Sequence, residues 1–495
     1  MYINVCRKGN KILVRDTQGD YEVSNFKPKL FIRASKKTNY LSSVKKYFVT
    51  PIEFDDANSF WNESKQYTSG GSFACGSKNV LDQFMFDNYE GELSTNFNDI
   101  KIFNIDIEVH AEKGFPHPED AEWPINAITV KYNNSFYIWG LPLNNEKFEY
   151  TDKRYHYNEF KNESDLMMHF IKFWSKEAPH IVTGWNSEFF DIPYIYNRTK
   201  KLLGSVYANK LSPYNMCKMK TKKISQFREG ERLDIAGVSQ LDYLALYKKF
   251  ILSPRENYKL DTIAEVELDE KKLDYEEYGS LKKLYIENYQ TFMDYNVKDV
   301  ELVSRLDDKL NLLRLAITIA NFAKVNYEDV FSPIRTWESA IYHHLMNKNI
   351  VPEINSIDNS KDSKYAGAFV IPPIPNMYEW VIAFDLDSLY PSIIRQWNIG
   401  PETICDPFKL SEISQQIFCN IKEEKLIAGD IALGHLKEEN LTLAPSGYLF
   451  HKDQQSFLSE LMEILFERRI DEKNLMKDAK SVLQSIKEEK KLRGI

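Results

Sequence analysis

Two acidic residues in a short alternating segment are the first side chains of this chain that could do chemistry. The segment reads Asn104-Ile105-Asp106-Ile107-Glu108-Val109. Successive side chains of a β-strand point to opposite faces, so we expect Asp106 and Glu108 on one face and the apolar residues in the core. Neighbouring carboxylates repel each other unless cations lie between them. The pair fits a metal site, although taken alone it fits a solvated strand face better.

Two further elements could add acids to this pair. Asp191 lies in Gly184-Trp185-Asn186-Ser187-Glu188-Phe189-Phe190-Asp191-Ile192-Pro193-Tyr194, so it is either a site acid or the N-cap of the helix that follows. Tyr295 and Asp299 lie four positions apart in an expected helix, which places their side chains on one face. Those two residues alone would ordinarily be a surface pair. The strand Asp-x-Glu, the helix-start Asp and the helical Tyr-x-x-x-Asp together indicate an active site.

A third acidic motif lies later in the chain and reads Phe384-Asp385-Leu386-Asp387-Ser388-Leu389-Tyr390-Pro391-Ser392. The apolar run from Val381 predicts a buried strand over Val381–Leu386 that carries Asp385 near its end, and Pro391 indicates a turn after it. A core strand with a capping acid is the alternative for an isolated aspartate. The complete motif argues against that alternative.

The elements that must position these residues predict a multidomain chain of mixed α/β and α+β class. Residues 1 to about 95 contain short alternating strands, and from 102 to about 320 strands alternate with helices around a mostly antiparallel or mixed central sheet. The expected elements there are strands over 102–109, 126–132 and 180–185, and helices over 164–177 and about 289–323. Polar residues 355–363 predict a linker, and residues 452–493 form one amphipathic helical pattern.

The composition excludes several classes of protein. The chain has 495 residues, 43% of them hydrophobic and 27% charged, as expected for a folded protein of two to four domains. No apolar run approaches the length of a membrane span. The five cysteines, at positions 6, 75, 217, 405 and 419, lack zinc-ligand spacing and fit a reducing cytoplasm. The net charge of −8 argues against a simple basic nucleic-acid binder.

The acidic motifs between residues 102 and 299 together resemble the DEDDy class of 3′–5′ exonucleases, which have a ribonuclease H-like fold. The resemblance implies hydrolysis of a phosphodiester with two Mg²⁺ ions, or alternatively Mn²⁺. It assigns the metal ligands to Asp106, Glu108, Asp191 and Asp299. Tyr295 would orient the attacking water, because a phenol with a pKa of about 10 is a poor base at pH 7 but a good hydrogen-bond partner.

The motif from Phe384 to Ser392 resembles the first metal-binding motif of family B DNA polymerases of T-even-type phages. Residues 331–337 and 398–404 support this likeness, which extends over nearly the whole chain. It implies that Asp385 and the Leu386 carbonyl bind the catalytic metals.

The same likeness implies a nucleotide site and a DNA contact. Backbone N–H groups of Ser388 and Leu389 would bind the triphosphate of the incoming nucleotide. The remaining implied contacts are Tyr390 under the sugar, Arg469 on the triphosphate, and Tyr365 and Gly367 on the DNA.

The likeness also divides the chain into domains. It implies an N-terminal domain over 1–100 that is completed by about 321–363, and an exonuclease domain over 101–320. The N-terminal part of the palm would cover 364–450, and the first fingers helix 451–495. Residues 222–232 predict a hairpin with its turn at Glu229-Gly230, which is either an element that parts primer from template or an ordinary surface hairpin.

Two departures from the family pattern shape the functional prediction. Asp387 stands where the motif is usually neutral. The second catalytic aspartate, on a Gly-Asp-Thr-Asp hairpin, and the lysine-bearing helix before it do not occur in this sequence. We therefore expect the N-terminal subunit of a split phage polymerase, with a complete proofreading site and polymerisation only beside a C-terminal partner chain. The alternatives are a stand-alone 3′–5′ exonuclease with a DNA-binding palm fragment, and a non-enzymatic nucleic-acid binding module.

The expected partners follow from this hypothesis. They are primer-template DNA, dNTPs, the C-terminal chain, a sliding clamp and single-stranded DNA-binding protein, in the cytoplasm of an infected bacterial host and without a membrane. The apolar stripe from Phe457 to Leu483 predicts that the isolated chain is poorly soluble or self-associates, because soluble monomers seldom expose such a patch.

Overall fold

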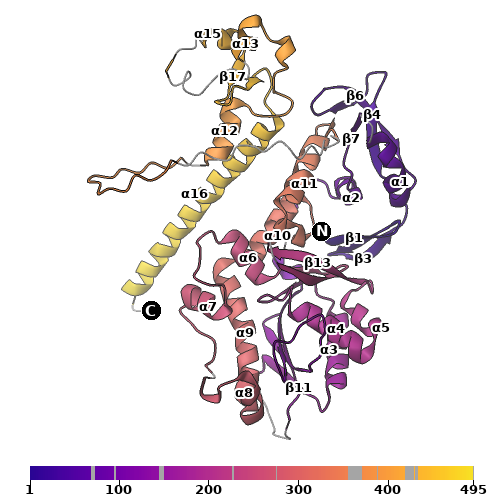
Figure 1. The fold of residues 1–495 in the computed structure, drawn as a ribbon, viewed down its shortest axis with the longest axis vertical. Helices are drawn as coiled ribbons and strands as arrows, with labels where there is room; N and C mark the ends of the chain where they lie inside the picture. The colour runs from indigo at the N-terminus through magenta and orange to yellow at the C-terminus, as the bar shows by residue number, and fades with distance from the viewer. Residues whose placement is uncertain are drawn as a thin grey trace. The chain divides into compact units, whose positions relative to one another are not determined.

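The computed structural model describes residues 1–68, 73–93, 96–143, 150–225, 228–274, 276–354, 371–386, 388–417, 428–429 and 433–493 (Figure 1). The chain forms two compact units. Unit 1 comprises residues 1–32 and 51–348, and unit 2 comprises residues 33–50 and 349–495. This division is coarser than the four domains predicted from the sequence, and the finer boundaries stay a prediction.

Unit 1 begins with a small antiparallel sheet of β1 (Tyr2–Lys8), β2 (Lys11–Asp16) and β3 (Gly19–Val23). Strands β4 (Lys29–Arg33) and β7 (Ala74–Cys75) also pair in antiparallel fashion. The predicted strands of residues 1–95 are therefore present. They are joined by two helices that the alternation of residues did not predict, α1 (Ala57–Thr68) and α2 (Val80–Asn88).

A six-stranded mixed sheet forms the centre of unit 1. Its order is β11-β10-β9-β8-β12-β15, and the strands are β8 (Ile102–Val109), β9 (Ile125–Tyr132), β10 (Ser135–Gly140), β11 (Tyr155–Glu159), β12 (Ile181–Thr183) and β15 (Ser239–Gln240). Strand β8 pairs antiparallel with β9 and parallel with β12. The strands predicted over 102–109, 126–132 and 180–185 are confirmed, and the mixed pairing is as expected.

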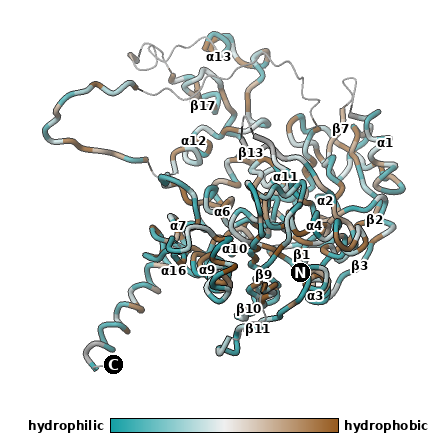
Figure 2. Tube along the Cα trace, turned by 60° about the horizontal axis from the view of Figure 1, so that its bottom comes forward, coloured by the Kyte–Doolittle hydropathy of each residue, from teal (hydrophilic) through white to brown (hydrophobic). Residues whose placement is uncertain are grey.

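Helices cover both faces of this sheet. Hydrophobic residues lie along its strands β9 and β10 and along the covering helix α9 (Tyr289–Leu310) (Figure 2). Helices α3 (Glu163–Glu177) and α4 (Asp191–Leu203) contribute Phe170, Trp174 and Ile195 to the core that holds Ile105 and Ile107. Helix α9 (Tyr289–Leu310) packs against β8 and β9. The two isoleucines of β8 therefore face α3 and α4, which leaves the alternate residues of the strand for the face under α9.

The helical stretch predicted over 289–323 consists of two helices. Asn311, with a φ of 54°, separates α9 from α10 (Leu312–Ala323). Asparagine adopts this left-handed conformation more readily than most residues, and the chain uses it to end one helix and start the next. Helices α6 (Tyr243–Phe250), α7 (Leu260–Leu268), α8 (Leu281–Glu287) and α11 (Pro333–Met346), with the 3₁₀ helix η4 (Tyr327–Phe331), complete this part of unit 1.

The predicted hairpin is present as β13 (Cys217–Ser225) and β14 (Arg228–Ile235). Its predicted turn at Glu229-Gly230 is wrong, because Glu229 pairs with Lys223 and Gly230 pairs with Lys222 inside the ladder. The pattern of a polar residue before glycine indicated a turn, but here glycine lies within a strand.

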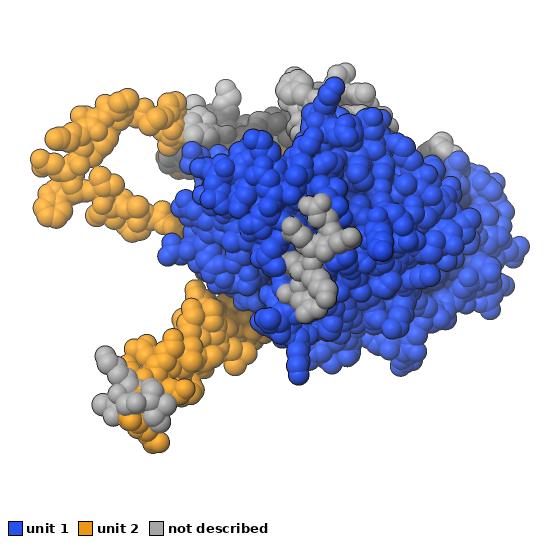
Figure 3. Space-filling model, turned by 90° about the horizontal axis from the view of Figure 1, so that it is seen from below, with its two compact units in different colours: residues 1–32, 51–348 blue, residues 33–50, 349–495 orange. Residues whose placement is uncertain are grey.

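Unit 2, orange in Figure 3, contains β5 (Tyr40–Ser42), which pairs in parallel with β16 (Ile350–Val351). It also contains a pair of helices. Helix α12 (Leu389–Trp397) packs against α16 (Phe457–Leu492), which confirms the long helix predicted over 452–493. A small core around Cys405, Leu441 and Leu449 joins the hairpin β17 (Leu441–Leu443) and β18 (Leu449–His451) to the neighbouring helices.

The buried strand predicted over Val381–Leu386 is absent. Residues 371–386 are irregular, and their apolar side chains are exposed, with Phe384 at 92% and Val381 at 76%. A strand needs neighbours for its backbone N–H and C=O groups. Among the described residues, none pairs with this segment.

In the part of the chain that the structure describes, none of the helices has both the length and the apolar character that crossing a membrane requires.

Candidate active site

Strand β8 holds Asp106 and Glu108 on the face turned away from its isoleucines. Ile105 and Ile107 are 1% and 4% exposed, whereas the two acids are half-buried. The strand alternation predicted from the sequence is therefore confirmed. The acidic face lies under α9, so it is not a solvated strand face.

Helix α9 adds Asp299 to these two acids. Carboxylate oxygens of Asp106, Glu108 and Asp299 all lie within 4.8 Å of one another. Asn296, one turn earlier on the helix, donates from Nδ2 to Asp106 Oδ2 at 2.7 Å. Asn104 Nδ2 donates to the Val300 carbonyl at 2.8 Å and fixes β8 against the helix. Acids almost two hundred positions apart thus form one cluster.

Asp191 reaches the same place from the start of α4. Its Oδ1 accepts a hydrogen bond of 2.9 Å from the backbone N–H of Ile107, the residue between Asp106 and Glu108. Asp191 is the first residue of the helix and 3% exposed, and the N-cap position belongs to Phe190. The N-cap interpretation is therefore wrong, because the carboxylate binds the neighbouring strand.

The loop before Asp191 can approach β8 only because residue 184 is glycine. A Cβ atom on Gly184 would overlap the carbonyl oxygen of Ile105. The backbone N–H of Tyr243 donates to the Gly184 carbonyl at 2.9 Å, and the N–H of Ile192 donates to the Ser187 carbonyl at 3.1 Å. These contacts hold the loop close to the strand that carries Asp106 and Glu108.

Lys272 is a residue of this cluster that sequence reasoning missed. Its Nζ lies 2.5 Å from Asp299 Oδ2 and 3.1 Å from the Tyr295 hydroxyl, and 5.0 Å from the centre of the Tyr295 ring. The backbone N–H of Lys272 donates to Asp261 Oδ1 at 2.8 Å, which fixes the connection between α7 and α8. Lys272 lies in a charged segment without a motif, so no local signal could have identified it.

Burial and mutual repulsion perturb the acids. Burial raises the pKa of Glu108 to about 8, with Asp299 adding to the rise, and raises the pKa of Asp191 to about 7. Burial also raises the pKa of Asp106 well above its ordinary value, reinforced by the charges of Asp191, Asp299 and Glu108. Carboxylates in such a cluster ionise together only beside cations, and carboxylate oxygens are the ligands that Mg²⁺ prefers. The donor set therefore fits divalent metal ions.

Tyr295 remains a neutral phenol in this environment. Burial raises its pKa, and so does the negative charge of Asp299, while Lys272 acts in the opposite direction. A neutral hydroxyl can both donate and accept a hydrogen bond. Tyr295 can therefore orient a polar group but cannot act as a base near pH 7.

The residues predicted for the second site lie in unit 2, and the structure brings two of them together. Arg469 Nη1 donates to the hydroxyl of Ser388. Ser388 has a φ of 52° and precedes α12, which has no side-chain cap at its N-terminus. Leu389 and Tyr390 are the first residues of that helix.

Two further members of the predicted second site lie in irregular backbone. Asp385 and Leu386 belong to the irregular segment before α12, and Leu386 is 68% exposed. Tyr365 and Gly367, as well as Asp387, lie outside the described residues. The contact between Arg469 and Ser388 is therefore the geometry observed at this site within the described ranges.

Comparisons with known proteins find similarity to DNA polymerases in both parts of the chain. Residues 77–263 match the family "DNA polymerase family B, exonuclease domain", and residues 335–492 match "DNA polymerase family B". The DNA-directed DNA polymerase of Escherichia phage RB69 is 33% identical over 98% of this chain and 55% of that relative. The chain belongs to DNA polymerase family B.

Further family B relatives show the same partial coverage. The DNA-directed DNA polymerase of Enterobacteria phage T4 is 31% identical over 94% of this chain and 53% of its own length. The DNA polymerase delta catalytic subunit of Schizosaccharomyces pombe is 28% identical over 62% of this chain and 29% of its own length. This family B chain thus spans about half the length of the phage relatives it matches.

The family matches contain most of the predicted site residues. The exonuclease match includes Asp106, Glu108 and Asp191, and the polymerase match includes Asp385 and Arg469. Asp299 and Lys272 lie beyond the end of the exonuclease match. Their place in the family B exonuclease region comes from the packing of α9 on β8.

Proposed function

We propose that this family B chain removes nucleotides from the 3′ end of DNA by hydrolysing the terminal phosphodiester. The convergence of Asp106, Glu108, Asp191 and Asp299 from two helices and one strand carries the proposal. These four residues would hold two divalent metal ions, with Mg²⁺ as the expected ion and Mn²⁺ as the alternative. Such ions supply an activated water and stabilise the departing 3′ oxygen.

The chain's own residues prepare the site for this reaction. Tyr295 is neutral and can hydrogen-bond a water molecule without taking its proton. Asp191 and Asn296 fix the acids of β8, since one accepts from the backbone of Ile107 and the other donates to Asp106. The cluster is thus already assembled by contacts within the protein, as catalysis by fixed groups requires.

A cavity next to the Asp191 loop supports single-stranded DNA as the substrate. It has a volume of about 300 Å³, and its lining combines the aromatic rings of Phe115 and Phe190 with Asn186, Lys248 and the acids Glu119 and Glu231. Phe115 is 64% exposed, and its ring lies 5.6 Å from that of Phe190. Exposed aromatic rings beside a cationic side chain bind unpaired bases by stacking and the backbone by charge.

We propose that unit 2 supplies half of a site for nucleotide transfer. Asp385 and the Leu386 carbonyl would bind metal, and Ser388, Leu389, Tyr390 and Arg469 would bind the incoming dNTP. The hydrogen bond between Arg469 and Ser388 supports a shared anion site, because a guanidinium and the N-terminus of a helix both attract phosphate. Tyr365 and Gly367 would contact the primer-template DNA.

Polymerisation would require a partner chain that carries the second catalytic aspartate and the nucleotide-binding lysine. Exposed apolar residues on the segment before α12 and on α16 support this proposal, among them Trp380, Phe384, Leu475 and Leu483. A surface of this kind is typical of a protein interface. In an infected bacterial cell, a sliding clamp and single-stranded DNA-binding protein would be further partners of the assembled polymerase.

The test of both proposals uses a 5′-labelled primer-template, Mg²⁺ and the purified chain, with and without dNTPs. We expect shortening of the primer, its loss in Asp106→Ala, and no extension. Adding a polypeptide with the second half of a family B polymerase domain should restore extension, and Asp385→Ala should abolish it. Extension by the chain alone would refute the need for a partner. Absence of shortening would refute the exonuclease.

A further inference from the structure

Arg232 on β14 joins three segments of unit 1. Its Nη1 lies 2.8 Å from Glu188 Oε1, its Nη2 lies 3.0 Å from Glu328 Oε2, and its Nε lies 3.2 Å from Asp234 Oδ1. The Arg232 side chain is 15% exposed and that of Glu188 4%. One guanidinium therefore neutralises carboxylates from the loop before α4, from η4 and from its own strand.

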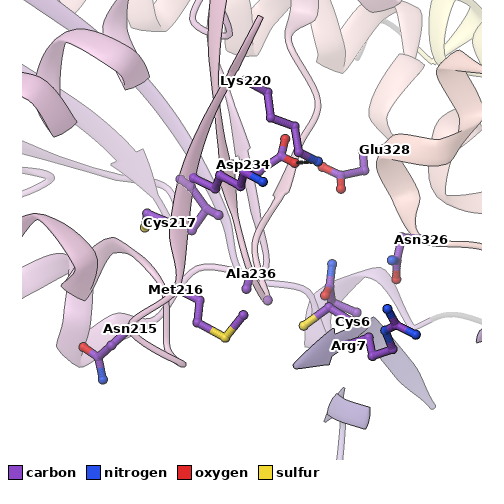
Figure 4. A pocket seen from close by; sticks show the side chains of 14 residues that line it. Cys6, Arg7, Asn215, Met216, Cys217, Lys220, Asp234, Ala236, Asn326 and Glu328 are labelled. Carbon is purple, nitrogen blue, oxygen red and sulfur yellow. Dashed lines mark ion pairs between the residues drawn. The ribbon is translucent and has the colours of Figure 1, made fainter. Parts of the chain in front are cut away.

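This network borders a cavity of about 550 Å³ (Figure 4). Asp234 and Glu328 line the cavity, and Lys220 forms an ion pair with Asp234 there. Lys220 is opposite Arg232 in the β13–β14 ladder, so Lys220, Arg232 and Asp234 lie on one face of this hairpin, where Arg232 also binds Glu188.

Glu188 is the member of this network that leads to the acid cluster. It lies three residues before Asp191, in the loop that Gly184 allows to approach β8. The backbone N–H of Glu188 donates to Asp242 Oδ2 at 3.0 Å, and Asp242 Oδ1 in turn accepts from the N–H of Ala245 at 3.1 Å. Asp242 thus binds the backbone N–H of Glu188, and Arg232 binds the buried carboxylate of the same residue.

We propose that Arg232 is a positioning residue of the exonuclease centre. Through Glu188 it keeps the loop against β8, so that the Asp191 carboxylate stays on the Ile107 N–H, beside Asp106 and Glu108. The consequence is tighter binding of divalent metal by the acid cluster. This inference rests on the proposed exonuclease function, but its own prediction concerns metal affinity and can be measured without catalysis.

The chemistry of arginine suits this task better than that of lysine. The planar guanidinium binds Glu188 and Glu328 through separate nitrogens and fixes the angle between them, whereas an ammonium is a point charge on a flexible stem. Some residues contact the ligands of a metal without binding the metal themselves. Replacing such a residue typically lowers metal affinity or activity by about 10–100-fold. Loss of Arg232 would also leave Glu188 buried beside other carboxylates, which favours movement of the loop.

The test measures Tb³⁺ binding by luminescence sensitised through nearby tyrosine and tryptophan. We expect Arg232→Met to weaken Tb³⁺ binding by about 10-fold or more, Arg232→Lys by less, and Glu188→Gln about as much as Arg232→Met. The double variant Arg232→Met/Glu188→Gln should bind no more weakly than either single variant. In the nuclease assay, Arg232→Met should need more Mg²⁺ for half-maximal rate, with the rate at saturating Mg²⁺ largely restored.

Arg335→Met is the matched control. Arg335 is 21% exposed and ion-pairs with Asp82 at 2.5 Å, so its loss also breaks a buried ion pair in unit 1. It should lower the melting temperature and leave Tb³⁺ affinity within about twofold of the wild type. Equal weakening by Arg335→Met and Arg232→Met would show a general loss of stability and overturn the inference.

Two reference variants separate this inference from the proposed function. Asp106→Ala and Asp191→Asn should each weaken Tb³⁺ binding. If they do and Arg232→Met does not, the positioning role is refuted while the metal site stands. The opposite outcome is that Tb³⁺ binds through these acids and Arg232→Met weakens this binding, but the wild type does not shorten DNA. The exonuclease function then fails and the positioning role stands. If Asp106→Ala and Asp191→Asn leave Tb³⁺ binding unchanged, both fail.

Discussion

Replacing Lys272 by methionine tests whether the acid cluster needs a cation when metal is absent. Lys272 Nζ lies 2.5 Å from Asp299 Oδ2, and methionine keeps much of the side-chain length while removing the charge. Asp299 is 5% exposed, so it would lose a buried partner. Removing one member of a buried ion pair costs about 3–5 kcal/mol. Because the Lys272 side chain is 25% exposed, we expect the lower end, about 3 kcal/mol.

This cost should be visible as a lower melting temperature. Unfolding entropy is about 2.1 cal/mol/K per residue, so unit 1, with roughly 330 residues, shifts by about 1.4 °C for each kcal/mol. Lys272→Met should therefore melt about 4 °C lower than the wild type in EDTA near pH 8.5. Near pH 6.5 the loss should be smaller, because Glu108 and Asp191, with pKa values of about 8 and 7, then take up protons and repel each other less.

Mg²⁺ should reverse much of the loss, since the metal and Lys272 neutralise the same carboxylates. The assay is calorimetric melting of wild type and variant in EDTA and in excess Mg²⁺, with Lys298→Met as the control. Lys298 lies next to Asp299 on α9 and pairs with Glu301 at 2.9 Å and with Glu270 at 3.3 Å; these carboxylates are 38% and 31% exposed, so its loss should cost less than about 1 kcal/mol. Identical melting of wild type and Lys272→Met in EDTA, or equal stabilisation of both by Mg²⁺, would refute the reasoning.

Three further outcomes are expected. Without metal, unit 1 should lose stability as the pH rises from about 5 to 8, because the folded pKa values of Glu108 and Asp191 lie above their unfolded values near 4 and the folded state holds more protons; a flat melting profile in EDTA would contradict this. Gly184→Ala should cut the exonuclease rate at least about 10-fold by forcing the loop off Ile105, whereas Gly434→Ala, which meets open space, should not. Phe115→Ala should weaken binding of single-stranded DNA by about 1–3 kcal/mol, measured by fluorescence anisotropy against a Phe408→Ala control.

Local periodicity predicted the faces of three of the four acids, whereas Asp191 joined the predicted site through the resemblance to DEDDy exonucleases. Asp106 and Glu108 follow from strand alternation, and Tyr295 and Asp299 follow from the helical repeat. Lys272 and Arg232 could not be predicted in this way. Each lies in a segment rich in charge, and only the packing of α9 on β8 and of β14 on the Asp191 loop selects one basic residue from several neighbours. Periodicity shows which face a residue takes, but contacts between distant elements decide which charge it meets.

Unit 2 shows that the same reasoning predicts helices better than strands. Helices α12 and α16 satisfy their backbone within the helix, so the sequence predicted α16 and the structure contains it. The segment over 381–386 has the apolar content of a strand, but a strand is stable only when another strand accepts its hydrogen bonds. Phe384 is instead 92% exposed, and none of the strands in the described part of the chain pairs with the segment that holds Asp385. Helix packing is therefore sufficient to bring Arg469 to Ser388, whereas placing Asp385 requires neighbouring strands, which the proposed partner chain would supply.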